Sequence, residues 1–198
     1  FIETVQTYPI QKIKENALKL LKGVSPIYTY HSIDHTLYVL EVSLKIGKYY
    51  KLSILELELI QIAALFHDIG YLDGPQDHEQ KSCSYVEKEM EKYKIKKEHL
   101  TLIQQMIMST KIPQQPKSLL DRIIADADLE YIGTNSFWET GEKLFQEIKF
   151  SNPTFTTEEW NRIQFKFLSD HIFHTSYCKR YKQKRKEKYI NELKTMIL

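Results

Sequence analysis

The stretch "IQIAALFHDIGY" (residues 60–71) decides how the rest of the chain is interpreted. It is apolar on almost every helical face up to His67, which is typical of a helix buried at the centre of a domain. The preceding Ser53-Ile-Leu-Glu56 has the spacing of a capping box and marks the beginning of that helix. His67 and Asp68 close the apolar run, where a carboxylate without a partner is costly. The stretch predicts either a polar site at the end of a central helix or a helix end that faces water.

Outward from this stretch, nearly every segment has the pattern of a helix. Asp34 can cap a helix that ends at Gly47, and Ser136 and Thr156 each open a further capping-box sequence. No alternation with a period of two residues lies between turn residues, so no strand is expected. The other helices are expected from Pro9 to about Lys22, over about 79–93, 98–109 and 118–132, and from about Ser169 toward the C-terminus. The sequence therefore predicts an all-α helical bundle.

Length and composition indicate a globular protein with its own core. The chain has 198 residues, of which 42% are hydrophobic and 27% charged, which fits a single domain. Its two cysteines cannot form a disulfide framework and no charged-then-apolar leader opens the sequence, so a cytoplasmic location is expected. No apolar run approaches the ~20 residues of a membrane span, so no membrane partner is expected. The net charge of +2 gives no general attraction to nucleic acid.

Two histidines lie upstream of the central helix in "YHSIDH" (residues 30–35). His31 and His35 have the spacing that would align them on one helical face. If Asp34 caps the helix, however, His31 lies in the preceding loop and His35 in the first turn. Both histidines can also be surface or half-buried residues with no ligand role.

Carboxylates come from "IIADADLEYIG" (residues 123–133), which places Asp126 and Asp128 in an apolar helix where unpaired charges are rare. Residues at positions i and i+2 cannot share a helical face, so only one of the two is expected to point inward. The apolar residues of this helix flank both aspartates about equally, so helical geometry does not choose between them. Both can also lie at the rim of the helix.

Two further residues are candidates for a site. His78, in "DHEQKS" (residues 77–82), begins another helix and is either a further ligand or part of a polar loop. Lys111 follows "IMST" and could reach a substrate phosphate as a point charge. An ordinary surface lysine is the more frequent case at such a position.

Two histidines and two aspartates make a mixed nitrogen and oxygen donor set. Such a set suits octahedral divalent ions such as Mn, Fe, Co, Ni or Mg, with Zn also a candidate, better than a closed structural zinc site. A bound divalent ion lowers the pKa of its water and neutralises charge that develops on a phosphoryl group. The set therefore predicts the hydrolysis of phosphate esters.

The order His35, His67-Asp68, Asp128 resembles the H…HD…D pattern of the HD-domain metal-dependent phosphohydrolases, and "ALFHDIGY" resembles their HD helix. The family's first metal site would carry over to these four residues, and Asp68 would also be catalytic. Asp128 is preferred to Asp126 because the "LEYIG" that follows it resembles the run after the ligand aspartate in related hydrolases.

The resemblance also implies the domain organisation and the number of ions. It covers roughly residues 28–135 as the core of one HD domain spanning residues 1–198, with C-terminal helices over about 136–198, and the implied fold is all-α. One tightly bound divalent ion is expected. A second, weaker ion would use Asp68 as a bridge together with His78, but its shell stays incomplete because "IMSTK" has no histidine.

"YHSIDH" also resembles the Tyr-His-Asn-x-x-His segment of cyclic-nucleotide phosphodiesterases, with Ser32 in place of the Asn. In those enzymes the first histidine protonates the leaving oxygen, so the resemblance implies that His31 is catalytic. The expected substrate is a nucleotide or similar phosphate ester, with a cyclic-nucleotide phosphodiester to be tested first. "HDIGYL" lacks the acidic residues that follow the pair in ppGpp hydrolases and 5′-nucleotidases, and no HD-GYP loop is visible.

Two other functions compete with this one. Degenerate HD domains sense ligands or regulate without catalysis, although the complete set of ligand candidates argues against degeneration here. Residues 179–188 hold seven basic residues and one acidic residue, which could attract an anionic partner. Such a run is more often a solvated helix face, so nucleic acid is not the expected partner. The oligomeric state, a homodimer included, is left open.

Overall fold

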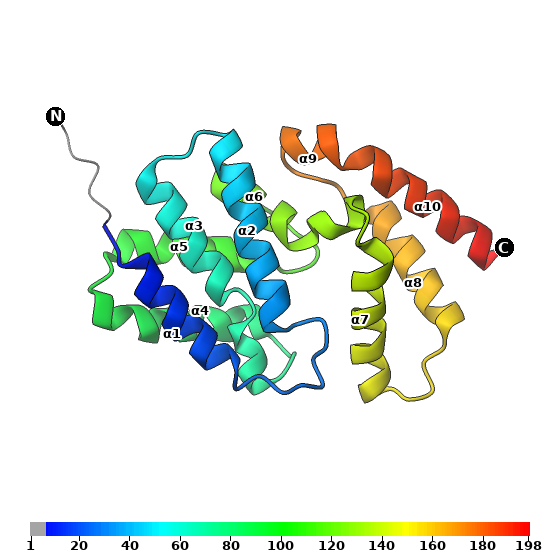
Figure 1. Cartoon of the computed structure of the whole chain (residues 1–198), viewed down its shortest axis with the longest axis horizontal. Coiled ribbons are helices and arrows are strands. Elements are labelled where there is room, and N and C mark those ends of the chain that lie inside the picture. Colours follow the sequence, from blue (N-terminus) through cyan, green and yellow to red (C-terminus); the bar gives the residue numbers. More distant parts are fainter. Residues whose placement is uncertain (1–6) are drawn as a thin grey trace. The chain divides into compact units, whose positions relative to one another are not determined.

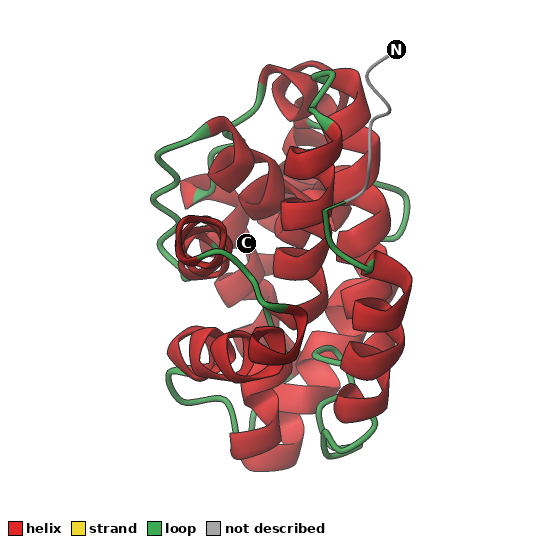
Figure 2. Cartoon of the chain, turned by 90° about the vertical axis from the view of Figure 1, so that its left-hand side faces the viewer, coloured by secondary structure: helices red, strands yellow, loops and turns green. Residues whose placement is uncertain are grey.

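The computed structural model describes residues 7–198, and the regular elements in that range are all helices (Figure 2). The all-α prediction is therefore confirmed. In chain order the elements are α1 (Ile10–Leu21), α2 (Ile33–Tyr49), α3 (Ile54–Phe66), η1 (Ile69–Asp73), α4 (His78–Met90), η2 (Glu91–Tyr93), α5 (Lys97–Ser109), α6 (Leu119–Leu129), η3 (Glu130–Gly133), α7 (Phe137–Ser151), α8 (Thr157–Asp170), α9 (Ser176–Tyr181) and α10 (Gln183–Ile197), where η marks a short 3₁₀ helix.

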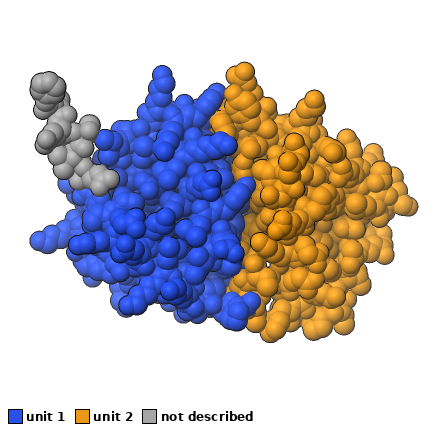
Figure 3. All heavy atoms as spheres, viewed as in Figure 1, with its two compact units in different colours: residues 1–26, 31–128 blue, residues 27–30, 129–198 orange. Residues whose placement is uncertain are grey.

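The chain divides into two compact units (Figure 3). Unit 1 comprises the described residues up to 26 together with 31–128, and unit 2 comprises residues 27–30 and 129–198. The organisation of residues 1–198 as one HD domain stays a prediction. Across residues 7–198, no helix has both the length and the apolar character that a bilayer crossing requires.

Helix α3 lies at the centre of unit 1, where it packs against α1, α2 and α5 (Figure 1). Every residue from Ile62 to Phe66 is fully buried, as the apolar sequence predicts. One charged side chain of α3, Glu58, is also buried, and its carboxylate accepts hydrogen bonds from the backbone N–H groups of Thr7 (2.9 Å) and Tyr8 (3.3 Å). These donors compensate the burial of the carboxylate.

The start of α2 differs slightly from the prediction. Ser32, with an extended backbone, precedes the first helical residue, so Asp34 lies in the first turn and does not cap the helix. A carboxylate in the first turn still interacts favourably with the helix dipole. His31 lies just before α2 and His35 in its first turn, as predicted.

Two of the three predicted capping boxes form. Ser53 and Thr156 each accept a hydrogen bond from the backbone N–H of the glutamate three residues later, whose carboxylate returns to the cap. Ser136 does not cap α7, because its ψ of 3° is not the extended conformation that a capping residue adopts. Its N–H instead donates to Thr134 Oγ1 at 3.2 Å.

Two predicted helix boundaries are wrong. Gly47 does not end α2, which continues to Tyr49. Ser169 does not begin the last helix either, because it lies in the last turn of α8. The chain then leaves the helix and re-enters it at α9, where Thr175 Oγ1 accepts the N–H of Cys178 at 3.1 Å.

Unit 2 has its own aromatic core. Phe145, Phe155 and Trp160 form a buried cluster in this unit. Phe137 stacks on Tyr189 of α10 with ring centroids 4.4 Å apart. Helix α10 also packs against α8, α9 and η3, so it forms an integral part of this unit.

Part of the basic stretch 179–188 is used inside unit 2. Lys182 Nζ lies 2.6 Å from Glu130 Oε1, and Lys186 is 3% exposed with its Nζ donating to the carbonyl of His171 at 2.5 Å. The expectation of a solvated face is therefore wrong for these two lysines. Lys179 and Arg180 are exposed.

Candidate metal centre

The candidate site is built on the sharp turn that follows α3. His67 is the last residue in helical conformation after α3, and Asp68 directly precedes the 3₁₀ helix η1. Ser82 of α4 holds this turn with two buried hydrogen bonds: Gly70 N–H donates to Ser82 Oγ (2.9 Å), and Ser82 Oγ donates to the His67 carbonyl (2.8 Å). The turn and the first part of α4 therefore form one hydrogen-bonded assembly.

Gly70 allows α4 to approach this turn closely. A Cβ atom at this position would overlap the carbonyl oxygen of His78, which is backbone and cannot swing aside. Only glycine leaves the space that this approach needs. The consequence is that His78, the first residue of α4, lies beside Asp68.

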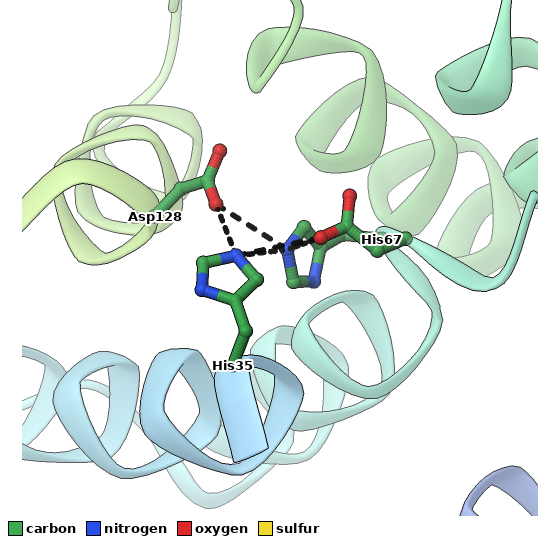
Figure 4. Close-up of side chains that lie close together, drawn as sticks. His35, His67 and Asp128 are labelled. Carbon is green, nitrogen blue, oxygen red and sulfur yellow. Dashed lines mark hydrogen bonds and ion pairs between the residues drawn. The ribbon is translucent and has the colours of Figure 1, made fainter. Parts of the chain in front are cut away.

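His35, His67, Asp68 and Asp128 converge on one point, with one ligand atom from each lying within 4.8 Å of the others. His35 Nε2 is 2.9 Å from Asp128 Oδ1 and 3.4 Å from Asp68 Oδ2. His67 Nε2 is 3.1 Å from Asp68 Oδ2 and 3.3 Å from Asp128 Oδ1. Figure 4 shows His35 projecting from α2 and Asp128 from α6 toward each other and toward His67.

His35 and His67 both direct their Nε2 atoms at this point. His67 Nδ1 lies 2.7 Å from the carbonyl of Ala64, and because a carbonyl only accepts, Nδ1 carries the proton. His67 Nε2 is then the ligand atom, and it lies 3.4 Å from His35 Nε2. A metal-binding histidine characteristically has its other ring nitrogen fixed in this way.

The two carboxylates and the histidines of this group change one another's pKa values. Asp68 Oδ2 is buried, and no group within residues 7–198 donates a hydrogen bond to it. Burial opposes ionisation of both aspartates, yet the neighbouring histidines lower the pKa of Asp128 to about 2 and hold that of Asp68 well below its usual range. Burial likewise disfavours protonated His67, but Asp68 and Asp128 raise its pKa well above the ordinary value. A cluster that retains a proton so strongly is one where a cation fits.

The structure separates the two aspartates of α6. Asp128 Oδ1 reaches both histidines, whereas Asp126 is fully buried and is not a member of the converging group. The residue chosen by the "LEYIG" resemblance is therefore the one placed with the histidines.

His31 lies beside the site and stacks on Tyr71. The two ring centroids are 4.0 Å apart with an interplanar angle of 16°, and the Tyr71 hydroxyl is 3.1 Å from His31 Nε2. The His31 ring is also 6.2 Å from that of His35. His31 is half-buried.

His78 contacts a member of the converging group, whereas Lys111 pairs with the exposed Asp77. His78 Nε2 is 3.2 Å from Asp68 Oδ1, the oxygen that does not face His35 and His67. Lys111 Nζ lies 4.0 Å from Asp77 Oδ1, with both side chains more than half exposed. Exposed pairs of this kind contribute little, so Lys111 is held loosely at the surface.

Sequence reasoning did not single out Tyr71, Ser82 or Glu79. Tyr71 packs on His31 and lies 4.6 Å, between ring centroids, from His78. Glu79 Oε1 is 3.5 Å from His78 Nε2. The signal for Tyr71 was its position just after the His-Asp pair, and that for Glu79 was its position next to His78; Ser82 carried no signal.

Two comparisons with known proteins gave matches. The model of the HD domain family matches residues 32–130, a range that includes every residue of the converging group. The crystal structure of a predicted HD superfamily hydrolase from an uncultured Thermotogales bacterium is similar to 95% of this chain and 89% of its own, with 21% identity and a TM-score of 0.58. That likeness is one of fold. No curated protein matches the chain.

Proposed function

The chain belongs to the HD domain family, and from that premise we propose that it is a metal-dependent phosphohydrolase. The observation that carries the proposal is the convergence of His35, His67, Asp68 and Asp128 on one point. These side chains come from α2, the end of α3 and α6, and packing alone gives no reason to bury two carboxylates against two imidazoles.

The donor set fits a divalent cation. Two imidazole nitrogens and two carboxylate oxygens suit octahedral Mn, Fe, Co, Ni or Mg, with Zn as a further candidate, and leave positions for water. The buried Asp68 Oδ2, to which no group in residues 7–198 donates a hydrogen bond, is the atom that most needs such an ion. We expect this ion to bind tightly and a second ion near His78 to bind more weakly.

A divalent ion at this point would polarise a water molecule and offset charge on a phosphoryl group. The chain's own residues supply orientation and protons. Ala64 fixes the tautomer of His67, and Ser82 fixes the turn that carries Asp68. His31 is the proposed proton donor to the departing oxygen, with Tyr71 holding its ring.

The proposed substrate is a nucleotide or related phosphate ester. A 3′,5′-cyclic nucleotide is the specific proposal, because its leaving group is a ribose alkoxide that needs a proton and His31 lies beside the site. This choice rests on the resemblance of "YHSIDH" to the phosphodiesterase segment and on the stacking of His31 against Tyr71.

The test is a metal analysis followed by an assay. The protein is loaded with Mn²⁺, its metal content is measured, and cyclic and linear nucleotides are screened for turnover. Asp128→Asn is expected to lose both metal and turnover, because it removes a ligand charge while preserving side-chain shape. Asp170→Asn, at an exposed position in unit 2, is the matched control and is expected to retain both.

Two outcomes contradict the proposal. A protein that binds no divalent ion would have a merely structural cluster at His35 and Asp128. A protein that binds the ion but turns over no phosphate ester would be a ligand-sensing member of the family.

A further inference from the structure

An open cavity lies in unit 1 around the loop of residues 110–118, which joins α5 to α6. Its volume is about 600 Å³, and its lining comes from the last turns of α5, from the loop and from the first turn of α6. Sites for small organic ligands in proteins have volumes of about 300–1,000 Å³. The cavity is therefore large enough for a molecule of the size of a mononucleotide, and a bare inorganic anion would leave most of it empty.

Hydrogen bonds hold the walls of this cavity in place. Ser109 Oγ, in the last turn of α5, is 3.3 Å from the carbonyl of Asp121 in the first turn of α6. The side-chain amide of Gln114 donates to the carbonyl of Ala125 at 3.0 Å, which ties the middle of the loop to α6. Binding between walls that are already fixed costs less conformational entropy than the ordering of a loose loop does.

The charges of the lining favour an anion. Asp121 is 6% exposed, and its Oδ2 already accepts the backbone N–H groups of Lys117 (3.2 Å) and Ser118 (3.1 Å). The ammonium group of Lys117 forms no ion pair within residues 7–198, and that of Lys111 makes only the exposed 4.0 Å contact with Asp77. The carboxylate is thus engaged by the backbone, whereas both ammonium groups can contact a ligand.

The rest of the lining suits the base of a nucleotide. Met108, Ile112 and Pro113 contribute apolar surface, and Ile112 is 56% exposed. Gln105 and Gln115 add amide groups that both donate and accept hydrogen bonds. Proteins bind nucleobases by these two means, with apolar side chains against the ring and polar groups along its edge.

We propose that this cavity binds a mononucleotide, with its phosphate against Lys111 and Lys117 and its base against Met108 and Ile112. The cavity shares no residue with the converging group, so the inference goes beyond the proposed function and does not depend on it. Lys111 could be named as a phosphate contact from sequence, and the structure adds Lys117 from the other end of the loop. The nucleotide is either a substrate of the metal centre or a separate effector.

The experiment is a nuclear magnetic resonance titration of the full chain, labelled with ¹³C at the methionine methyl groups and kept in EDTA so that no turnover takes place. The chain has four methionines (Met90, Met106, Met108 and Met196), of which Met108 lines the cavity. The probes are AMP, GMP, CMP and UMP, with the four nucleosides and inorganic phosphate as their separate parts. At least one nucleotide is expected to shift the Met108 signal saturably, and to bind about tenfold or more tightly than either of its parts. The Met196 signal, from unit 2, should not move.

Lys111→Gln and Lys117→Gln are each expected to weaken this binding by about tenfold, because each removes a hydrogen bond from a charged group to the phosphate. Lys97→Gln is the matched control, since Lys97 is exposed at the opposite end of α5 and does not line the cavity. It is expected to bind the nucleotide as wild type does. All these lysines are exposed, so the variants should fold.

The inference fails if none of the nucleotides shifts the Met108 signal, or if the three lysine variants bind equally well. Kinetics of the metal-loaded protein then identify the bound nucleotide. A raised KM with an unchanged kcat in Lys117→Gln assigns it as the substrate, whereas unchanged kinetics in the absence of added effector assign a separate effector. A protein without any turnover would contradict the proposed function and leave the binding result as it stands.

Discussion

At the scale of single residues, substitution of His31 tests the proposed chemistry most directly. We predict that His31→Gln lowers kcat for a susceptible nucleotide by about 100- to 10,000-fold, which is the usual contribution of a general acid. Metal content should not change, because His31 is not a member of the converging group. Steady-state kinetics and metal analysis of the same preparation measure both.

Tyr71→Phe serves as the companion variant, since it keeps the ring that stacks on His31 and removes the hydroxyl 3.1 Å from Nε2. A smaller loss of kcat is expected. Equal metal content with undiminished turnover in His31→Gln would assign the proton to another donor.

His171 is a residue whose protonation should affect stability. Burial first, and then the charges of Lys186 and His174, lower the pKa of His171 to about 3. Its folded-state pKa thus lies below the unfolded value of about 6.5, so the unfolded chain binds a proton that the folded chain excludes. Stability from this residue is present above about pH 6.5 and falls as the pH drops toward 3. The loss is below about 1.4 kcal/mol per pH unit, because the ring is only partly buried.

We predict that His171→Gln has a flatter dependence of unfolding free energy on pH between about 6.5 and 4 than wild type does. Urea unfolding at several pH values measures the difference, and other histidines cancel because both chains contain them. Parallel curves would show that His171 titrates normally in the folded chain.

Asp126 and Asp128 show how far single residues can be assigned from sequence. Positions i and i+2 differ by about 200° on a helix, so only one inward residue was expected, yet Asp126 is fully buried and Asp128 also reaches the histidines. Which of the two aspartates faces the histidines depends on the rotation of α6 about its axis. The apolar residues on either side do not fix that rotation. The family resemblance made the choice that helical geometry could not.

At the scale of elements, α4 and η1 depend on the hydroxyl of Ser82. We predict that Ser82→Ala lowers the unfolding free energy by about 1–3 kcal/mol, because it leaves buried groups of Gly70 and His67 without a partner. Ser84→Ala on the same helix is the control, since its exposed hydroxyl bonds only within α4. Chemical denaturation of both variants gives the comparison, and equal losses would contradict the role given to Ser82.

Helices were easier to predict than their ends. The capping boxes at Ser53 and Thr156 form, because residues with extended backbone precede both helices. The same residue pattern fails at Ser136, because η3 and a tight turn already set its backbone before α7 begins. A cap needs a conformation as well as a residue type, and the conformation is determined by what precedes it.

At the scale of the whole molecule, the candidate ligands are widely separated in sequence. His35 and Asp128 lie 93 positions apart, so an unfolded chain cannot hold them at one ion. An ion bound only by the folded chain stabilises it by about 2.7 kcal/mol at a hundredfold excess over Kd. We predict that Mn²⁺ at that excess raises Tm by about 5–10 °C and that a chelator reverses the rise. Differential scanning calorimetry measures it.

Asp128→Asn should lose this rise in Tm, whereas Asp170→Asn should keep it. An equal shift in both variants would place the bound ion elsewhere on the chain.

The fold class was accessible from sequence because apolar periodicity acts locally, whereas the members of the converging group were assigned through the family resemblance. The division into two units at Asp128 was not accessible, since α6 continues across it to Leu129 without a glycine, a proline or a change of composition. The use of Lys182 and Lys186 inside unit 2 was equally hidden, because their partners Glu130 and His171 are distant in sequence.

The absence of a side chain at position 70 has a consequence for how this protein can diversify. The distance between the turn at His67-Asp68 and helix α4 is set by a contact between backbone atoms. A change of side-chain rotamer therefore cannot widen it. Evolution toward binding a larger or smaller cation could not change this distance by repacking side chains. It would require different ligand atoms.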